Sequence, residues 1–232
     1  MELLYNGFTM DTPAGTFPLS TDSMVLSDFV RLPKNASILD LGSGCGALGL
    51  LLCAKDPGCS VSGIEIDPVA HQAALKNIAS NQLPHRLSSI CGDLRAFSSL
   101  ITPGSYTTCV SNPPYFSGGY ASSTLPLARQ NDCCSTEDLF AAAAWALQYG
   151  GDFYLVHKPE MLAQLMACAV RAKLEPKKLR LLRHQPGATV SLILLQCRKG
   201  AKPGLIWEEQ YLYEKDGTPS VHFKRIYHLQ EA

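Results

Sequence analysis

Short apolar runs alternate with longer segments of helical spacing from about residue 36 onward. This alternation predicts an α/β domain built on a mostly parallel sheet. The strand-like runs are residues 36–41, 60–66, 87–91, 107–110 and 152–157. The helical segments between and after them are residues 47–55, 68–81, 137–149 and 159–173, the third ending at Gly150-Gly151.

The last third of the chain changes its pattern. Residues 178–182 and 190–197 flank the turn HQPGAT, so two strands are predicted to pair antiparallel there. Residues 204–213 and 221–227 alternate in polarity around Asp216-Gly217 and predict a small appended β-hairpin. The sheet is therefore predicted to begin with parallel strands and to end with an antiparallel pair.

We expect a single domain with three parts. Residues 1–35 hold turns and one short helix beginning near Ser20 or Thr21. Residues 36–197 form the core, and residues 198–232 form a small C-terminal β extension.

Composition restricts the class of protein. The 232 residues are 46% hydrophobic and 17% charged, which suffices for a proper buried core. No apolar run approaches the ~20 residues that a bilayer span requires, so no membrane association is expected. The N-terminal MELLYNGFTMDT lacks the basic and apolar pattern of a secretory signal, which predicts a cytoplasmic protein.

The 9 cysteines fit a reducing compartment. Their number is odd and none has C-x-x-C spacing, while Cys133 and Cys134 are adjacent, which is poor geometry for one tetrahedral zinc. We expect no structural metal and mostly apolar packing roles.

Charge is distributed unevenly along the chain. Residues 1–170 contain 8 Lys and Arg against 14 Asp and Glu, and residues 171–232 contain 12 against 6. Such an excess is typical either of a phosphate-facing surface or of a solvated helix end and strand edge. The densest cluster comprises Arg171, Lys173, Lys177, Lys178, Arg180 and Arg183.

A glycine-rich turn follows the first predicted strand. The segment DLGSGCG contains Asp40, Gly42, Gly44 and Gly46, and glycines allow backbone N–H groups to approach a ligand at the strand ends. The same segment satisfies G-x-G-x-x-G, so a dinucleotide site and a purely structural turn remain alternatives.

Acids follow the next two strands. Glu65 ends the second strand, where a carboxylate can accept both hydroxyls of a ribose. Asp67 precedes Pro68 and is predicted to cap the next helix. Asp93 follows the third strand and is placed to accept from an adenine amine, although an Asp before a turn is also ordinary.

The most informative segment is SNPPYF, directly after the fourth strand. Two prolines stiffen the backbone beside the Asn112 amide, the Pro113 carbonyl and the Tyr115 ring. Two acceptors and an aromatic face suit an amino group on a planar system, and a base presented this way must be unpaired or flipped out. The alternative is an ordinary turn.

Taken in order, DLGSGCG, GIEID, GD and NPPY resemble the class I S-adenosylmethionine-dependent methyltransferases of the amino-methylating group. This resemblance implies a Rossmann-like, seven-stranded, mostly parallel sheet with an antiparallel last strand and helices on both faces. It implies that the glycine loop binds the methionine part of S-adenosylmethionine, Glu65 its ribose, and Asp93 with Leu94 its adenine. Catalysis is assigned to Asn112, Pro113, Pro114 and Tyr115.

A longer resemblance covers nearly the whole chain. FPLSTDSMVLSDF, NPPYFSGG and GLIWEEQYLYEKDG are similar to the bacterial tRNA1(Val) (adenine-N6)-methyltransferases, which modify the adenosine beside the anticodon. The resemblance implies that Thr21 and Asp22 help to close the cofactor pocket, alongside their helix-capping alternative. It implies a tRNA substrate, with no obligatory protein partner evident. The expected substrate contacts are Tyr115, Phe116, Arg129, Lys177 and Arg180.

Other substrates of this group remain alternatives, namely release-factor glutamine, ribosomal RNA guanine N2 or adenine N6, and DNA adenine. About 35 residues precede the first strand and about 35 follow the last, too few for the added domains of the glutamine and DNA enzymes. A noncatalytic, cofactor-binding RNA module is the alternative from a different class, although such a module would not need NPPY.

Overall fold

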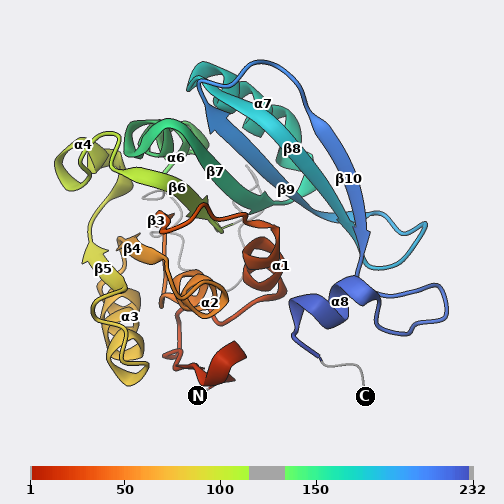
Figure 1. The fold of residues 1–232 in the computed structure, drawn as a ribbon, viewed down its shortest axis with the longest axis horizontal. Helices are drawn as coiled ribbons and strands as arrows, with labels where there is room; N and C mark the ends of the chain where they lie inside the picture. The colour runs from red at the N-terminus through yellow and green to blue at the C-terminus, as the bar shows by residue number, and fades with distance from the viewer. Residues whose placement is uncertain (1, 115–133, 230–232) are drawn as a thin grey trace.

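The computed structural model describes residues 2–114 and 134–229, and it shows a twisted central sheet with helices on both faces (Figure 1) and a separate 2-stranded antiparallel sheet near the N-terminus. The central sheet has 8 strands. In spatial order they are β10 (Ile206–Tyr211), β8 (Leu174–Arg183), β9 (Val190–Lys199), β7 (Leu147–His157), β6 (Tyr106–Ser111), β3 (Ser37–Leu41), β4 (Ser60–Glu65) and β5 (Leu87–Cys91).

The helices divide between the two faces of the sheet. One face packs against α1 (Thr21–Phe29), α2 (Ala47–Lys55) and α3 (Pro68–Ser80). The other packs against α4 (Phe97–Leu100), α6 (Thr136–Ala146) and α7 (Leu162–Arg171). The shorter elements are β1 (Glu2–Leu3), η1 (Tyr5–Gly7), β2 (Thr9–Met10), η2 (Leu94–Ala96), η3 (Pro159–Met161) and α8 (Val221–Ile226).

Burial on both faces explains the apolar strands. In β7, Tyr154 and Val156 pack on the α1 side, whereas Phe153 and Leu155 pack on the α6 side. A strand covered on both faces reads as a continuous apolar run, as FYLV does here.

The strand directions confirm the predicted architecture. Strands β5, β4, β3, β6 and β7 are mutually parallel, and β9 is antiparallel to both β7 and β8. The carboxyl ends of β3, β4, β5 and β6 therefore share one edge of the sheet, where ligands of open α/β sheets bind.

Three expectations need correction. The sheet has 8 strands rather than seven, because Ile206–Tyr211 adds to the edge parallel to β8. The appended hairpin is wrong, since Val221–Ile226 is a helix capped by Ser220, whose Oγ accepts from Phe223 N at 3.0 Å. The helix expected over residues 137–149 ends at Ala146, and β7 continues directly from Leu147 through Gly150.

Local capping explains where helices begin. Ser20 is the N-cap of α1, as expected, and its side chain accepts from Ser23 N. Asp67 caps α3, with Pro68 as the first helical residue, which confirms that prediction.

Within residues 2–114 and 134–229, no helix is both long and apolar enough to cross a bilayer. In the same part of the chain, His, Cys, Asp and Glu side chains form no group of three placed to share a metal ion.

Candidate functional site

The glycine loop leaves β3 and turns sharply into α2. Gly42, Gly44 and Gly46 have φ of +78°, +54° and +86°, in the left-handed region that favours glycine. The N–H groups of Gly42 and Ser43 both donate to Ile64 O at 3.0 Å, which fastens the loop to β4. Apart from each glycine itself and its two chain neighbours, no described atom lies within 4 Å of a Cβ built on Gly42 or Gly44. Among the described residues, the loop backbone therefore leaves space that a ligand can enter.

Asp40 lies at the base of this loop and is only 2% exposed. Its Oδ2 atom is buried and has no hydrogen-bond partner among the described residues. Burial, together with the nearby negative charge of Glu65, raises the pKa of Asp40 to about 7. A buried carboxylate with an unpartnered oxygen favours a cationic ligand group. An ammonium would supply the missing hydrogen bond and neutralise the negative charge.

Glu65 connects the glycine loop to the end of β4. Its Oε2 accepts from Gly44 N at 2.7 Å and its Oε1 accepts from Asp67 N at 2.8 Å. These two bonds fix the carboxylate, and each oxygen keeps a second lone pair. The arrangement is compatible with the predicted contact to a pair of ribose hydroxyls.

Asp93 and Leu94 follow β5 at the same edge. The Asp93 carboxylate receives three side-chain N–H bonds from Arg95, at 2.6–3.0 Å, and also accepts from Arg95 N at 2.9 Å. These hydrogen bonds lower the pKa of Asp93. The Leu94 side chain is buried in the core. The adenine contact stays a prediction, and no local sequence signal singles out Arg95 as the partner of Asp93.

The residues after β6 are held beside the glycine loop. Ser111 is fully buried, and its Oγ donates to Leu41 O at 2.7 Å, which ties the start of the NPP segment to the end of β3. Asn112 is half-buried, and its Nδ2 donates to Ser23 Oγ of α1 at 3.0 Å. Pro113 is half-buried and Pro114 is exposed. The expectations for Tyr115, Phe116 and Arg129 lie outside the described residues.

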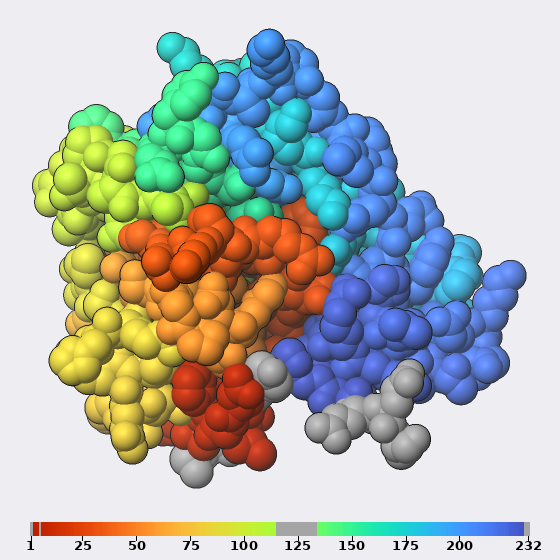
Figure 2. All heavy atoms as spheres, in the orientation of Figure 1, coloured from red at the N-terminus to blue at the C-terminus, as the bar shows by residue number. Residues whose placement is uncertain are grey.

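The N-terminal segment reaches this edge through α1. Thr21 Oγ1 and the Tyr227 hydroxyl are hydrogen-bonded at 2.9 Å, so Thr21 contacts the C-terminal helix. Asp22 stands in the first turn of α1 and is half-buried. In Figure 2 the C-terminal residues, in blue, lie against the orange-red residues of the N-terminal part. The pocket-closing role of Thr21 and Asp22 stays a prediction.

Two polar residues at the site were missed. Ser23 is one serine among several before the first strand, and only the packing of α1 on the sheet brings it to Asn112. Asn77 of α3 is buried, and its Nδ2 donates to Cys45 O of the glycine loop at 3.0 Å. A buried Asn on the apolar face of a predicted helix was the available signal for Asn77.

Much of the basic cluster is paired with acids within the chain. Arg180 is only 5% exposed, and its guanidinium is paired with Asp28 Oδ2 at 3.0 Å and with Glu208. Lys178 Nζ lies 2.7 Å from Glu208 Oε2, and Arg183 Nη2 lies 3.2 Å from Glu209 Oε1. The substrate contact of Arg180 stays a prediction, and its burial and pairing give it no support, because β10 and α1 supply acids that the linear charge count could not place.

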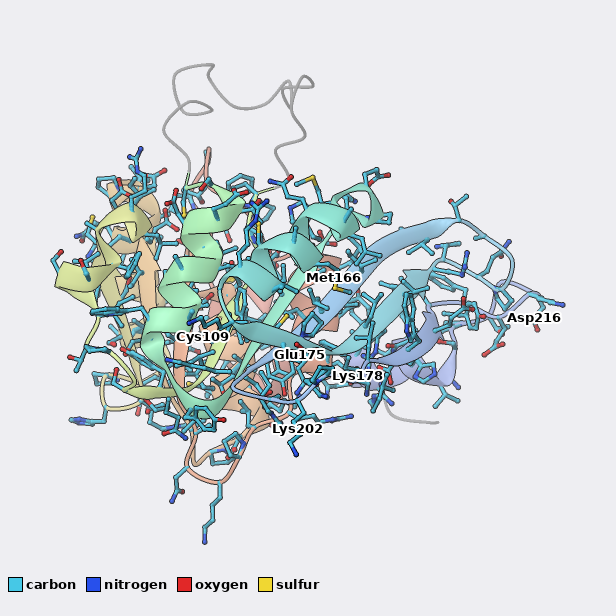
Figure 3. All side chains as sticks on the ribbon, turned by 90° about the horizontal axis from the view of Figure 1, so that it is seen from above. Cys109, Met166, Glu175, Lys178, Lys202 and Asp216 are labelled. Carbon is cyan, nitrogen blue, oxygen red and sulfur yellow. The ribbon has the colours of Figure 1, made fainter. Side chains whose placement is uncertain are left out.

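The rest of the cluster lies toward the other edge of the sheet. Lys177 stands near the start of β8, and its Nζ donates to Lys202 O at 3.0 Å. Figure 3 shows Glu175, Lys178 and Lys202 along this side of the molecule, with Asp216 at a distant tip. Lys173 lines a shallow surface pocket with Phe97 and Trp145. A contact of Lys177 with substrate thus gains no support from its position.

Comparisons with known proteins agree with this geometry. A family model described as the methyltransferase small domain matches residues 19–174. A tRNA1(Val) (adenine(37)-N6)-methyltransferase of Bacteroides fragilis (strain ATCC 25285) is 31% identical over 186 residues, covering 79% of this chain and 78% of that protein. A protein of the same name from Aeromonas hydrophila is 26% identical, covering 96% of this chain and 93% of its own.

Among solved structures, a predicted O-methyltransferase from Agrobacterium tumefaciens superposes with a TM-score of 0.75. It is 19% identical, and the match covers 90% of this chain and 96% of that one. At this identity the likeness shows the shared fold.

Proposed function

Because the chain belongs to the methyltransferase small-domain family, and within it to the tRNA1(Val) (adenine(37)-N6)-methyltransferases, we propose that it methylates the exocyclic N6 of an adenine in tRNA. The proposed adenine lies next to the anticodon of tRNA(Val). The observation that carries the proposal is the position of Asn112 and Pro113, at the carboxyl end of β6 and tied through Ser111 to the glycine loop.

The residues at this edge fit S-adenosylmethionine, which would supply an activated methyl group. The unpartnered Asp40 Oδ2 matches the ammonium of its methionine part, and the open backbone at Gly42 and Gly44 leaves room for it. Glu65, fixed by two backbone N–H bonds, is proposed to hold the ribose hydroxyls. Asp93 is proposed to accept from the adenine amine while it remains bound to Arg95.

The NPP segment is proposed to act on the substrate amine. The lone pair of an aromatic amino group is delocalised into the ring, so the nitrogen is a weak nucleophile. The Asn112 side-chain oxygen and the Pro113 carbonyl are two acceptors that favour a more tetrahedral nitrogen. Pro114 contributes no N–H beside that carbonyl, so the acceptor meets no competing donor from the next residue. As the new N–C bond forms, the methyl group would leave the sulfur of S-adenosylmethionine, and the amine would lose one proton to solvent.

The remaining parts of the proposal concern the substrate and its setting. Tyr115 is proposed to stack on the flipped base, with Phe116 and Arg129 contributing further contacts. We propose that the protein acts in the cytoplasm on tRNA, without an obligatory protein partner.

The test is transfer of labelled methyl groups to four acceptors in parallel: tRNA, ribosomal RNA, DNA and release factor, each isolated from cells lacking the enzyme. We expect label in tRNA alone, and nucleoside mass spectrometry should identify N6-methyladenosine beside the anticodon of tRNA(Val). Asn112→Ala serves as the inactive control. Label in release-factor glutamine or in ribosomal RNA guanine would replace the proposed substrate. Cofactor binding without transfer to any acceptor would favour a noncatalytic RNA-binding module.

A further inference from the structure

We propose that Ser23 is a positioning residue that sets the orientation of the Asn112 amide for the substrate amine. This inference rests on the proposed function, because it assigns to Ser23 the task of presenting the catalytic acceptor. Ser23 does not touch the reacting atoms in this proposal and acts only through Asn112.

An asparagine amide has two chemically different ends. Its oxygen is an acceptor and its NH₂ group is a donor, and the torsion that exchanges them has a broad, roughly two-fold preference. A substrate amine is itself a donor, so only the oxygen end of Asn112 can receive it. A flipped amide would bring two NH₂ groups face to face. The active site therefore needs a partner for the NH₂ end.

Ser23 supplies that partner. Asn112 Nδ2 donates to Ser23 Oγ at 3.0 Å, across 89 residues of sequence. Ser23 is only 6% exposed and Asn112 is half-buried, so this hydrogen bond is partly shielded from competition by water. With its nitrogen directed at α1, the amide directs its oxygen away from α1.

The helix that carries Ser23 is fixed by contacts on two sides. Lys55 Nζ of α2 donates to Ser27 O at 2.6 Å and to Val30 O at 2.7 Å. From the C-terminal helix, Arg225 donates to Asp28 at 2.7 and 2.9 Å. A positioning group is effective only if its own support is rigid, and α1 meets this condition.

A purely structural role for Ser23 predicts different behaviour. As a small buried side chain it would only fill space, and cysteine would then replace it well, because the two side chains are nearly isosteric. As a hydrogen-bond acceptor it would be replaced poorly by cysteine, whose sulfur is a weak acceptor. Ser27, one turn further along α1 and 7% exposed, provides a matched control in the same helix.

The kinetic experiment compares Ser23→Ala, Ser23→Cys and Ser27→Ala in methyl transfer to tRNA. We expect both Ser23 variants to lose about 10-fold in kcat, the effect of one hydrogen bond, with unchanged cofactor affinity by calorimetry. Ser27→Ala should keep the wild-type kcat. In an Asn112→Ala background, Ser23→Ala should cause no further loss, since the two residues act as one unit. Full activity in Ser23→Cys, or multiplied losses in the double variant, would overturn the proposal.

A second measurement does not depend on the substrate. In nitrogen-15 nuclear magnetic resonance spectra, the Asn112 side-chain NH₂ signal can be assigned by its absence in Asn112→Asp. We expect slow hydrogen exchange of this group in the wild type and in Ser27→Ala, and fast exchange in Ser23→Ala. Equally fast exchange in the wild type would refute the positioning role. If the wild type methylates none of the four acceptors, the proposed function fails, and this spectrum still decides whether Ser23 holds Asn112.

Discussion

Asp40 at the glycine loop is buried and Asp28 near the end of α1 is half-buried, and these two carboxylates are in opposite electrostatic situations. Asp28 receives hydrogen bonds from Arg225 and Arg180. Burial alone would raise the pKa of Asp28, but these partners outweigh burial and lower it. Asp40 has no such cation, and its pKa rises to about 7. The charge of Asp28 is therefore satisfied within the protein, whereas Asp40 Oδ2 has no hydrogen-bond partner among the described residues.

The same contrast separates the two charged regions of the molecule. Around β8 and β10, basic side chains form ion pairs with acidic side chains of the same chain. The dense run of Lys and Arg in the sequence thus contributes to the stability of the fold. At the carboxyl edge of β3 and β4, by contrast, Asp40 Oδ2 has no hydrogen-bond partner among the described residues, and Gly42 and Gly44 leave space beside the backbone. A charge that is already paired is weak evidence for a binding site, and an unpaired buried one is stronger evidence.

The largest expected effect is on stability, at the paired region. Arg180→Ala should lower the free energy of unfolding by about 3 kcal/mol, because it removes the charge-assisted hydrogen bonds of a buried guanidinium to Asp28 and to Glu208, each worth about 1.5 kcal/mol. Arg225 and Lys178 remain as partners of these two acids. The matched control is Arg198→Ala. It removes the ion pair between Arg198 and Asp152, and the Arg198 side chain is 45% exposed. That change should cost about 1 kcal/mol or less in urea denaturation. Equal losses for the two variants would refute the distinction between a buried and an exposed pair.

A nearly equal effect is expected on catalysis, at the NPP segment. Asn112→Ala should lower kcat for methyl transfer on the order of 100-fold, about 2.7 kcal/mol, because the amine loses a positioned acceptor. Cofactor affinity measured by calorimetry should stay unchanged, since Asn112 is proposed to act on the amine. If Asn112→Ala instead loses cofactor binding, the role of Asn112 would be to bind the cofactor and not the substrate amine.

A smaller effect is expected from pH, at Asp40. A carboxyl whose folded-state pKa exceeds its unfolded value binds a proton more tightly when folded, so its contribution to stability is full at low pH and declines as pH rises through the folded pKa. With a pKa of about 7, the ligand-free protein should lose about 1.4 kcal/mol of unfolding free energy between pH 6 and pH 8 on account of Asp40. Asp40→Asn should remove this decline in urea titrations at the two pH values. If the free energy of unfolding of Asp40→Asn still declines between pH 6 and pH 8 as in the wild type, a group other than Asp40 causes the decline.

The smallest effect is expected at the basic cluster. Lys177→Glu should change tRNA affinity by less than about 2-fold and leave cofactor affinity unaltered, because Lys177 lies near the start of β8 and away from Asn112. Filter binding at several salt concentrations would measure both affinity and its salt slope. A large loss with a shallower slope would return Lys177 to the phosphate-contacting surface.

Much of this fold follows from local sequence signals. Ser20 before a helix, Asp67-Pro68 at a helix start and glycines after an apolar strand each have one dominant local solution. The order of these signals was enough to predict the parallel sheet and to place Asp40, Glu65 and Asn112 at one edge of it.

Other features depended on contacts that no local signal encodes. The six residues of Val221–Ile226 fit both a helical and an alternating pattern, and tertiary packing decides between them. The edge strand β10 pairs in parallel with β8, and Glu208 and Glu209 form ion pairs there with basic side chains of β8. The partners of Arg180 and Asn112 are 152 and 89 residues away, respectively, and a single sequence does not reveal such pairings.

The hydrogen bonds between α1 and the C-terminal residues have a consequence for folding during synthesis. Asp28 and Arg225 are separated by 197 residues, and Thr21 and Tyr227 by 206. During synthesis from the N-terminus, α1 emerges early, but these bonds can form only when almost the entire chain has left the ribosome. Contacts this distant in sequence are also the slowest to find one another. The helix that holds Ser23 thus acquires its final support last, so that damage to the end of the message affects a site encoded near its beginning.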